Sequence, residues 1–333
     1  MILRTLKSNS SVNLILFPLF GIILWMKSIL IPIRYDFFLG ENKNSLFAPI
    51  SKITDGFDLI KVLLSLLLVI FIAFLIQQAN DRYLLIRTRT KLPATIFVII
   101  IGGFTEIHTL HPVYFAAVFL LLAIHSFFSV FNNPSTYPGI FNSGLILGIG
   151  ALFYFNLLIV VPAFLIGIFI LIREARWREF VILLLGLLVP FIFAISFAFY
   201  TNNLLEFFYT IERNIMTPVN HFRSNFVLQG FLGLLIIFTV LSSIKILQEY
   251  DTRKVSTRKY YSIFLFIFVF TIAGFILVPA ISQEMLVLSA VPVTFLMSNF
   301  FVSINSRFWG EFLFTLLLLS VIFMQFSDYL LNG

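Results

Sequence analysis

The chain has 333 residues, of which 60% are hydrophobic and 11% are charged, and its mean hydropathy is +1.04. Because soluble domains carry about 25% charged residues, this composition excludes an ordinary water-soluble fold. The net charge of +7 comes from short basic connections between apolar blocks, which argues against nucleic acid as a partner, and the absence of cysteine excludes disulfides and Cys-ligated metals.

Eleven apolar segments divide the chain, and each has the character of a helix that crosses a membrane. In chain order they are Val12–Ile33, Leu59–Ile76, Pro93–Thr105, Pro112–Phe131, Gly139–Phe155, Leu157–Ile172, Phe180–Tyr200, Phe226–Ile246, Tyr261–Pro279, Met285–Ile304 and Gly310–Leu331. No connection between them is long enough to fold by itself. The sequence therefore predicts one integral membrane domain over residues 1–333, an all-α polytopic transmembrane helix bundle of about eleven spans.

Lysine and arginine predict which side of the membrane each connection faces. With the amino terminus in the cytoplasm, the inner connections hold 15 of the 22 cations and the outer ones hold six. Cytoplasmic connections carry this excess in membrane proteins, so we expect a multi-pass protein of the cell inner membrane with a cytoplasmic amino terminus. The outer connections Arg34–Asp58 and Thr201–Asn225 mix aromatic and charged residues, which predicts helices lying at the interface.

The outer connections also carry the candidate catalytic residues. Asp36 follows the first span, and Glu106, His108 and His111 lie between the third and the fourth. Ionisable groups at this depth cost free energy, so a cluster of them indicates a functional site. A carboxylate there could act as general base on an acceptor hydroxyl, with an imidazole to orient it. The structural alternative is that Asp36 is an interface residue and the other three cap helix ends beside Pro112.

The same stretch is a candidate site for a divalent metal cofactor. Glu106, His108 and His111 form the pattern Glu-x-His-x-x-His, whose carboxylate and imidazoles suit Zn, Mn or Fe. Residues two apart do not share a helix face. The three ligands can therefore converge only if the backbone between the two spans is irregular.

Arg213 and Arg223 stand in a later outer connection, against the trend that keeps cations on the inner side. The planar guanidinium presents paired donors that match phosphate oxygens. These two arginines are therefore candidate ligands for the phosphate of a membrane lipid. The structural alternative is an interfacial helix whose charged residues are solvated.

Two features inside the spans indicate packing between helices. His125 lies within the fourth span, where an imidazole is expected to hydrogen-bond to a neighbouring helix. Gly144 and Gly148 have the spacing of two small residues on one helix face, which allows another helix to approach closely.

The chain resembles an uncharacterised, Phe-rich integral membrane protein family of Bacteroidota, classed as a domain of unknown function. The residues that carry this resemblance are Asn142–Tyr154, Trp177–Phe180 and Leu184–Phe191. That family implies a membrane fold and brings no established activity.

A second and looser resemblance concerns the run from Phe141 to Pro190, which is similar to the middle of GT-C-type membrane glycosyltransferases. Those enzymes use polyprenyl-phosphate-linked sugars and place acidic residues in their first outer loops, where Asp36 and Glu106 fall in this chain. The chain differs from them in having no Asp-x-Asp motif. This resemblance implies a transferase or polymerase at the outer leaflet that contributes to cell-envelope glycan synthesis.

Three interpretations of function follow from the sequence. The first is the GT-C-like enzyme, with Asp36 as general base, with Glu106, His108 and His111 placing the donor phosphate or a metal, and with Arg213 and Arg223 on the lipid pyrophosphate. The second is a transporter or flippase for a lipid or amphiphile, which requires a polar cavity among the spans. The third is a non-catalytic subunit of an envelope complex with membrane-protein partners.

Overall fold

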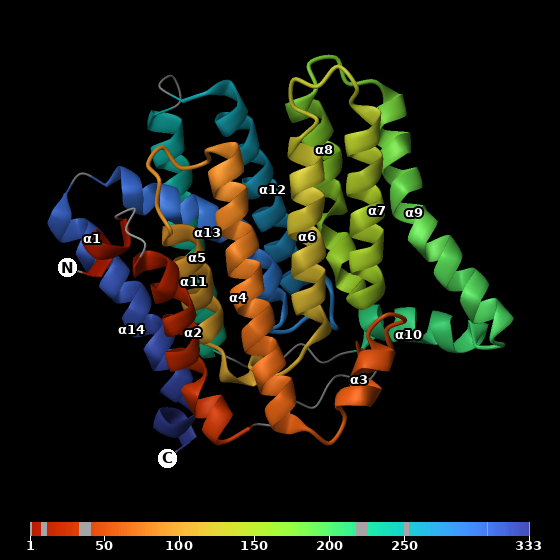
Figure 1. The fold of residues 1–333 in the computed structure, drawn as a ribbon, viewed down its shortest axis with the longest axis horizontal. Helices are drawn as coiled ribbons and strands as arrows, with labels where there is room; N and C mark the ends of the chain where they lie inside the picture. Colours follow the sequence, from red (N-terminus) through yellow and green to blue (C-terminus); the bar gives the residue numbers. More distant parts are fainter. Residues whose placement is uncertain are drawn as a thin grey trace.

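The computed structural model describes residues 2–7, 12–32, 41–217, 226–249, 253–304 and 306–332, and every regular element in these ranges is helical (Figure 1). The helices are α1 Ile2–Lys7, α2 Val12–Leu30, η1 Glu41–Lys43, α3 Ala48–Thr54, α4 Asp58–Tyr83, α5 Leu92–Gly102, η2 Thr105–Ile107, α6 Pro112–Phe128, α7 Tyr137–Phe153, η3 Phe155–Val160, α8 Val161–Leu171, α9 Trp177–Tyr200, α10 Leu204–Met216, α11 Phe226–Gln248, α12 Val255–Leu277, α13 Met285–Ser303 and α14 Arg307–Asn332.

Six of the described helices are long and apolar enough to cross a membrane, namely α4, α9, α11, α12, α13 and α14. The other predicted segments also form apolar helices, but their apolar stretches are only 10–17 residues long. A helix of 17 residues is about 25 Å long, which is less than the roughly 30 Å of a bilayer core. The all-helical fold with several apolar candidate spans is therefore confirmed, while the count of eleven spans and the side of the amino terminus stay predictions.

The shortest of these apolar helices, α5, lies with α13 at the centre of the bundle. Every residue of α5 is buried, and α13 is buried over 94% of its most apolar window, compared with 17% for α9. A helix that is apolar on all sides can be enclosed by protein on all sides. The centre therefore consists of α5 and α13, with α2 and α4 packed on α5 and with α6, α11 and α12 packed on α13.

Glycines bring α7 and α9 into backbone contact. A Cβ on Gly144 would lie 2.1 Å from the carbonyl oxygen of Leu183, and a Cβ on Gly186 would lie 2.3 Å from that of Phe141. Gly148 meets the Leu187 carbonyl in the same way, at 2.5 Å. The predicted packing role of Gly144 and Gly148 is confirmed, because only residues without a side chain allow these two backbones to approach so closely.

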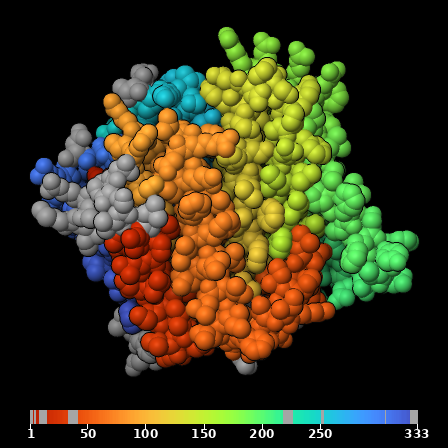
Figure 2. All heavy atoms as spheres, viewed as in Figure 1, coloured from red at the N-terminus to blue at the C-terminus, as the bar shows by residue number. Residues whose placement is uncertain are grey.

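Beyond this contact α9 leaves the bundle. Pro190 lies inside α9, where it removes a backbone hydrogen bond, and prolines of this kind bend helices. The lower part of α9 runs outward and leads into α10, which lies across the lower end of the molecule (Figure 1). In Figure 2 the green atoms of this region project from the side of the bundle, next to the orange atoms of α3.

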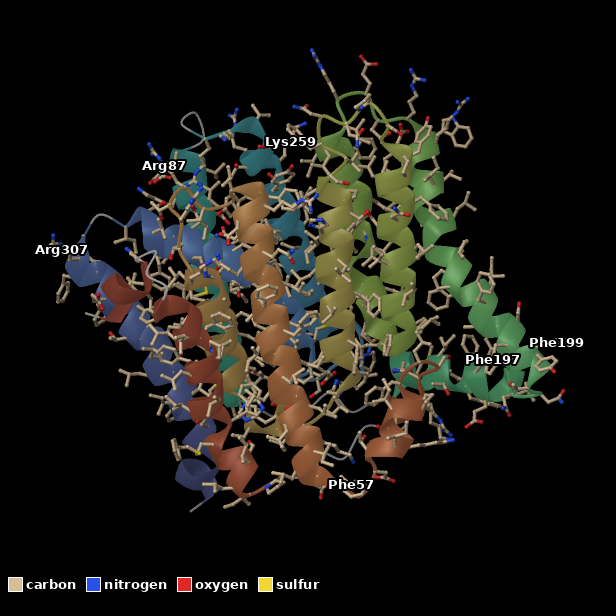
Figure 3. All side chains as sticks on the ribbon, viewed as in Figure 1. Phe57, Arg87, Phe197, Phe199, Lys259 and Arg307 are labelled. Atoms are coloured by element: carbon tan, nitrogen blue, oxygen red, sulfur yellow. The ribbon has the colours of Figure 1, made fainter. Side chains whose placement is uncertain are left out.

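The two ends of the bundle differ in chemistry. In the view of Figure 3, Arg87 and Lys259 lie at the upper end, and Phe57, Phe197 and Phe199 lie at the lower end. The predicted hydrogen bond of His125 is confirmed and lies between helices, since the Tyr83 hydroxyl of α4 is 3.2 Å from its Nδ1. Both connections that the sequence assigns to the interface contain helices, α3 and α10.

The α7–α9 contact gives a direct test of the packing. We expect Gly144→Ala to lower the free energy of unfolding by at least about 1–3 kcal/mol, because the new methyl group overlaps the α9 backbone. Thermal unfolding in detergent measures the loss. Gly233→Ala is the matched control, since Gly233 in α11 has no described atom within 4 Å of an added Cβ. Equal stability of the two variants would contradict the contact.

Candidate functional site

The connection between α5 and α6 lies inside the protein. His108 is 1% exposed and His111 is fully buried, while Glu106 in η2 is half-buried. Both imidazoles are therefore enclosed by protein in the structure. Irregular backbone inside an apolar bundle requires partners within the protein for its polar groups.

His108 is held by side chains from two helices. Its ring stacks on Trp25 of α2 with centroids 3.8 Å apart and an interplanar angle of 15°. Its Nδ1 lies 2.9 Å from the Ser28 hydroxyl, and its carbonyl oxygen lies 2.9 Å from the Ser65 hydroxyl of α4. The same Ser65 oxygen accepts the Trp25 indole N–H at 3.1 Å. The imidazole thus fixes the connection to α2 and α4.

The surroundings of His108 keep its ring neutral. Burial lowers the pKa of this imidazole to about 3, and it outweighs the carbonyls of Ile101 and Gly102, which favour the charged form. The positive charge of Lys27 lowers the pKa further. An imidazole that does not protonate near pH 7 is a poor proton acceptor. The predicted catalytic role of His108 therefore gains no support, and its contacts assign it to the packing of the connection.

Trp25 reports the charge of His108 directly. We expect the fluorescence of Trp25 to stay constant between pH 5 and pH 8, because the stacked ring remains neutral with a pKa of about 3. The measurement uses the double variant Trp177→Phe and Trp309→Phe, which leaves Trp25 as the single tryptophan. Both replaced side chains are exposed. Because the folded pKa lies below the ordinary histidine value of 6.5, the stability from the neutral ring is complete above about pH 6.5 and is lost as the pH falls towards 3. Quenching with a midpoint near 6.5 would contradict this.

A second buried polar cluster joins three connections. The Tyr154 hydroxyl, at the α7–η3 junction, donates to Glu284 Oε1 at 3.2 Å, and the backbone N–H of Ser282 donates to the same oxygen at 2.7 Å. His111 meets the edge of the Tyr154 ring, with centroids 6.0 Å apart. Its Nδ1 accepts the N–H of Val113 at 3.2 Å, so a neutral ring carries its proton on Nε2. The cluster ties the α5–α6 and α12–α13 connections to the end of α7.

Sequence reasoning missed Glu284 and Tyr154. A single acid at the start of the apolar segment Met285–Ile304 is itself a signal, because an ionisable group in such surroundings must have partners. Its proximity to Tyr154, which is 130 positions away, is visible only in the fold. A carboxylate with a phenol and an imidazole nearby has the groups for proton transfer, and it also fixes three backbone segments.

Removing the Tyr154 hydroxyl tests the structural role of this cluster. We expect Tyr154→Phe to lower the free energy of unfolding by about 1–3 kcal/mol, because a buried carboxylate loses a donor. Tyr137→Phe serves as control, since Tyr137 is 42% exposed. Chemical unfolding of both variants measures the difference. An unchanged free energy of unfolding in Tyr154→Phe would contradict the structural role of this cluster.

The structure bears differently on the other predicted site residues. Among the described residues no group of three His, Asp or Glu side chains could hold a metal ion, so the interpretation of Glu106, His108 and His111 as metal ligands gains no support. Asp36 and Arg223 lie outside the described residues. The predicted meeting of Asp36 with the α5–α6 connection therefore stays a prediction.

Arg213 lies near a groove that the sequence did not indicate. The groove has a volume of about 610 Å³ and lies between lower α9, α10 and the η1–α3 segment. Its wall is formed by apolar side chains, among them Leu152, Pro190, Phe193 and Phe197. Asn44 holds the segments around it together, because its amide donates to the Phe153 carbonyl at 2.9 Å and its oxygen accepts from Asn214 of α10 at 2.8 Å.

The polar residues that line this groove include Lys43 and Glu206. Lys43 and Glu206 form an ion pair there, with Nζ and Oε1 2.9 Å apart. The hydrogen bond and the charge of Lys43 hold the pKa of Glu206 below its usual value, and the charges of Lys52 and Arg213 act in the same direction. Of these three cations, Lys43 lines the groove and is paired with Glu206, while Lys52 and Arg213 lie close enough for their charges to act on Glu206.

No protein-family model, no curated protein and no solved structure matches this chain. The resemblances to the Bacteroidota membrane family and to GT-C-type glycosyltransferases therefore stay expectations, and the function is argued from the geometry alone.

Proposed function

We propose that this protein binds a phosphate-bearing lipid of the outer leaflet in the groove beside α9. The observation that carries the proposal is an apolar wall in a groove that Lys43 lines, with Lys52 and Arg213 close to its acid Glu206. A lipid needs both, since its chain is apolar and its head group is anionic.

The apolar part of the groove suits a lipid chain. Phe193 and Phe197 belong to the half of α9 that stands away from α7, and α9 is buried over only 17% of its most apolar window. A helix of this length and hydropathy contacts acyl chains on its exposed side. A lipid chain can therefore enter the groove sideways from the bilayer and lie against the phenylalanines.

The polar rim suits a phosphate. Lys43, Lys52 and Arg213 bring three positive charges to a site with Glu206 as the acid. Arginine and lysine bind phosphate oxygens through charge-assisted hydrogen bonds. The excess of Lys and Arg in the connections of the opposite end supports a cytoplasmic position for that end, which puts the groove in the outer leaflet of the cytoplasmic membrane.

A polyprenyl-phosphate-linked sugar is one lipid of this chemistry. The transferase or polymerase interpretation rests on the resemblance to GT-C enzymes, with Asp36 and Glu106 as its acids. A transporter and a non-catalytic subunit of an envelope complex are the alternatives, and each would use the bound lipid differently.

Photo-crosslinking tests the lipid site. The protein in nanodiscs is exposed to a diazirine-labelled phosphatidylglycerol, and the crosslinked peptides are identified by mass spectrometry. We expect labels on α9 and α10, and we expect Lys43→Gln with Arg213→Gln to reduce them about tenfold because two phosphate contacts are lost. Ala198→Phe should also reduce them, because Ala198 lines the groove.

The matched control is Arg173→Gln with Arg178→Gln, which removes the same charge from the exposed connection at the other end of α9. Its crosslinking should equal that of the unmodified protein. Equal labelling by phosphatidylglycerol and by a zwitterionic lipid, or no effect of the groove variants, would refute the proposal.

A further inference from the structure

A basic hollow lies at the end of the bundle opposite to the groove. Its volume is about 330 Å³, and it is lined by the α4–α5 connection and by the residues on either side of the α11–α12 turn. Among the described residues that line it, four are cations, namely Arg87, Arg89, Arg253 and Lys254, and one is an acid, Glu249. A cavity of this size with this charge is suited to a small anion.

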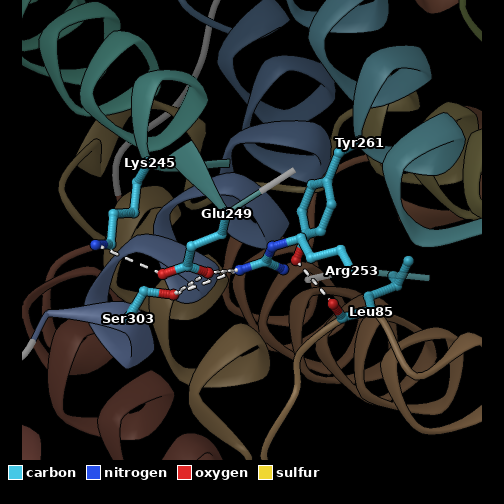
Figure 4. Close-up of polar contacts among 6 residues, drawn as sticks. All are labelled: Leu85, Lys245, Glu249, Arg253, Tyr261 and Ser303. Carbon is cyan, nitrogen blue, oxygen red and sulfur yellow. Dashed lines mark hydrogen bonds and ion pairs between the residues drawn. The ribbon is translucent and has the colours of Figure 1, made fainter. Parts of the chain in front are cut away.

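Arg253 is held in a fixed position at this hollow (Figure 4). Its guanidinium donates to Glu249 and lies over the ring of Tyr261, with the guanidinium carbon 5.8 Å from the ring centroid. The Tyr261 hydroxyl in turn donates to the Leu85 carbonyl at 3.1 Å. Only 9% of the Arg253 side chain is exposed, and its buried Nε has no hydrogen-bond partner among the described residues. A buried cationic donor is therefore in place before any ligand binds.

The acid in the hollow is already engaged. Glu249 pairs with Lys245 at 3.5 Å as well as with Arg253, and Ser303 Oγ lies 3.4 Å from its Oε2. Burial raises the pKa of this carboxyl, but the hydrogen bonds and charges of Arg253 and Lys245 together outweigh burial and lower it. Glu249 is thus ionised and is balanced by two cations.

The remaining cations of the hollow are not neutralised. Within the described part of the chain, Arg87, Arg89 and Lys254 take part in no ion pair, since the pairs on this end join Lys91 to Asp81 and join Glu249 to Lys245 and Arg253. The hollow therefore has an excess of positive charge that an anion would balance.

The backbone contributes further donors. Helix α12 begins at Val255, and its N-cap residue Lys254 makes no side-chain hydrogen bond to the first turn. The first N–H groups of a 23-residue helix carry partial positive charge and need acceptors. Thr257 of this turn is buried and lines the hollow. Anions bind where such N–H groups and cationic side chains meet.

We propose that this hollow is a binding site for a phosphate group, presented either by a phospholipid head group or by a soluble phosphate compound. Arginine forks and the helix N–H groups together offer the many donors that three phosphate oxygens accept. The site shares no residue with the groove beside α9, so the two proposals can fail separately.

Ligand-dependent thermal stability tests this site on the full chain. In zwitterionic nanodiscs, inorganic phosphate and pyrophosphate are titrated and the shift in Tm is converted to an apparent Kd. In parallel, phosphatidic acid is added to the bilayer as the lipid probe. We expect Arg87→Gln with Arg89→Gln to weaken the bound phosphate about tenfold or more, because two charged donors are lost.

Two further variants keep the test decisive. Arg253→Gln should abolish the Tm shift with phosphate. Because this variant also loses the ion pair with Glu249, it can unfold the end of α11. The conclusion therefore rests on the variants of Arg87 and Arg89, which are exposed. Arg173→Gln with Arg178→Gln removes equal charge from another exposed basic connection and should change the affinity less than about twofold.

Each outcome has a meaning. A shift with inorganic phosphate that Arg87→Gln and Arg89→Gln abolish assigns the site to soluble phosphates, and a shift seen only with phosphatidic acid assigns it to a lipid head group. The proposal is overturned if no phosphate probe shifts the Tm, or if the control variant loses as much affinity as the hollow variant.

Discussion

The structure depends on the requirement that polar groups inside an apolar bundle find partners within the protein. The α5–α6 connection illustrates this requirement, because its backbone is irregular and buried. Side chains from three other helices supply partners for its carbonyl groups. The Gln325 amide of α14 donates to the Gly102 carbonyl, and the Tyr114 hydroxyl of α6 donates to the Ile107 carbonyl. The Ser65 hydroxyl of α4 donates to the His108 carbonyl. In hydrocarbon each of these carbonyls would cost several kcal/mol if left alone.

This requirement gives the ionisable residues in the connection a structural explanation. Depth in the membrane indicates that a histidine has a reason to be there, but the reason at His108 is contact with Trp25 and Ser28. The residues with free access to a ligand lie elsewhere, on surfaces where helices diverge. The groove beside α9 and the basic hollow are each lined by residues from more than one helix or connection, and cations are among the lining residues of both.

Much of the fold is predictable from the sequence, for physical reasons. Long apolar segments become helices because backbone groups have no other partner in lipid, and Gly144 and Gly148 mark a close helix contact because no other residue permits it. The candidate site is less predictable. Tyr154 and Glu284 meet only through the fold, and the burial of His108 depends on α2 and α4, which no local pattern reveals. Arg213 was identified because its charge opposes the trend of its side of the membrane.

The bend of α9 has a consequence for how a ligand reaches the protein. Because the half of α9 after Pro190 diverges from α7 (Figure 1) and α9 is mostly exposed, a lipid bound in the groove as proposed would reach it from the bilayer and not from water. A molecule dissolved in the leaflet can then arrive by two-dimensional diffusion and never leave its hydrocarbon surroundings. Occupancy would follow the mole fraction of that molecule among the lipids, and its concentration in the aqueous phase would have no direct influence.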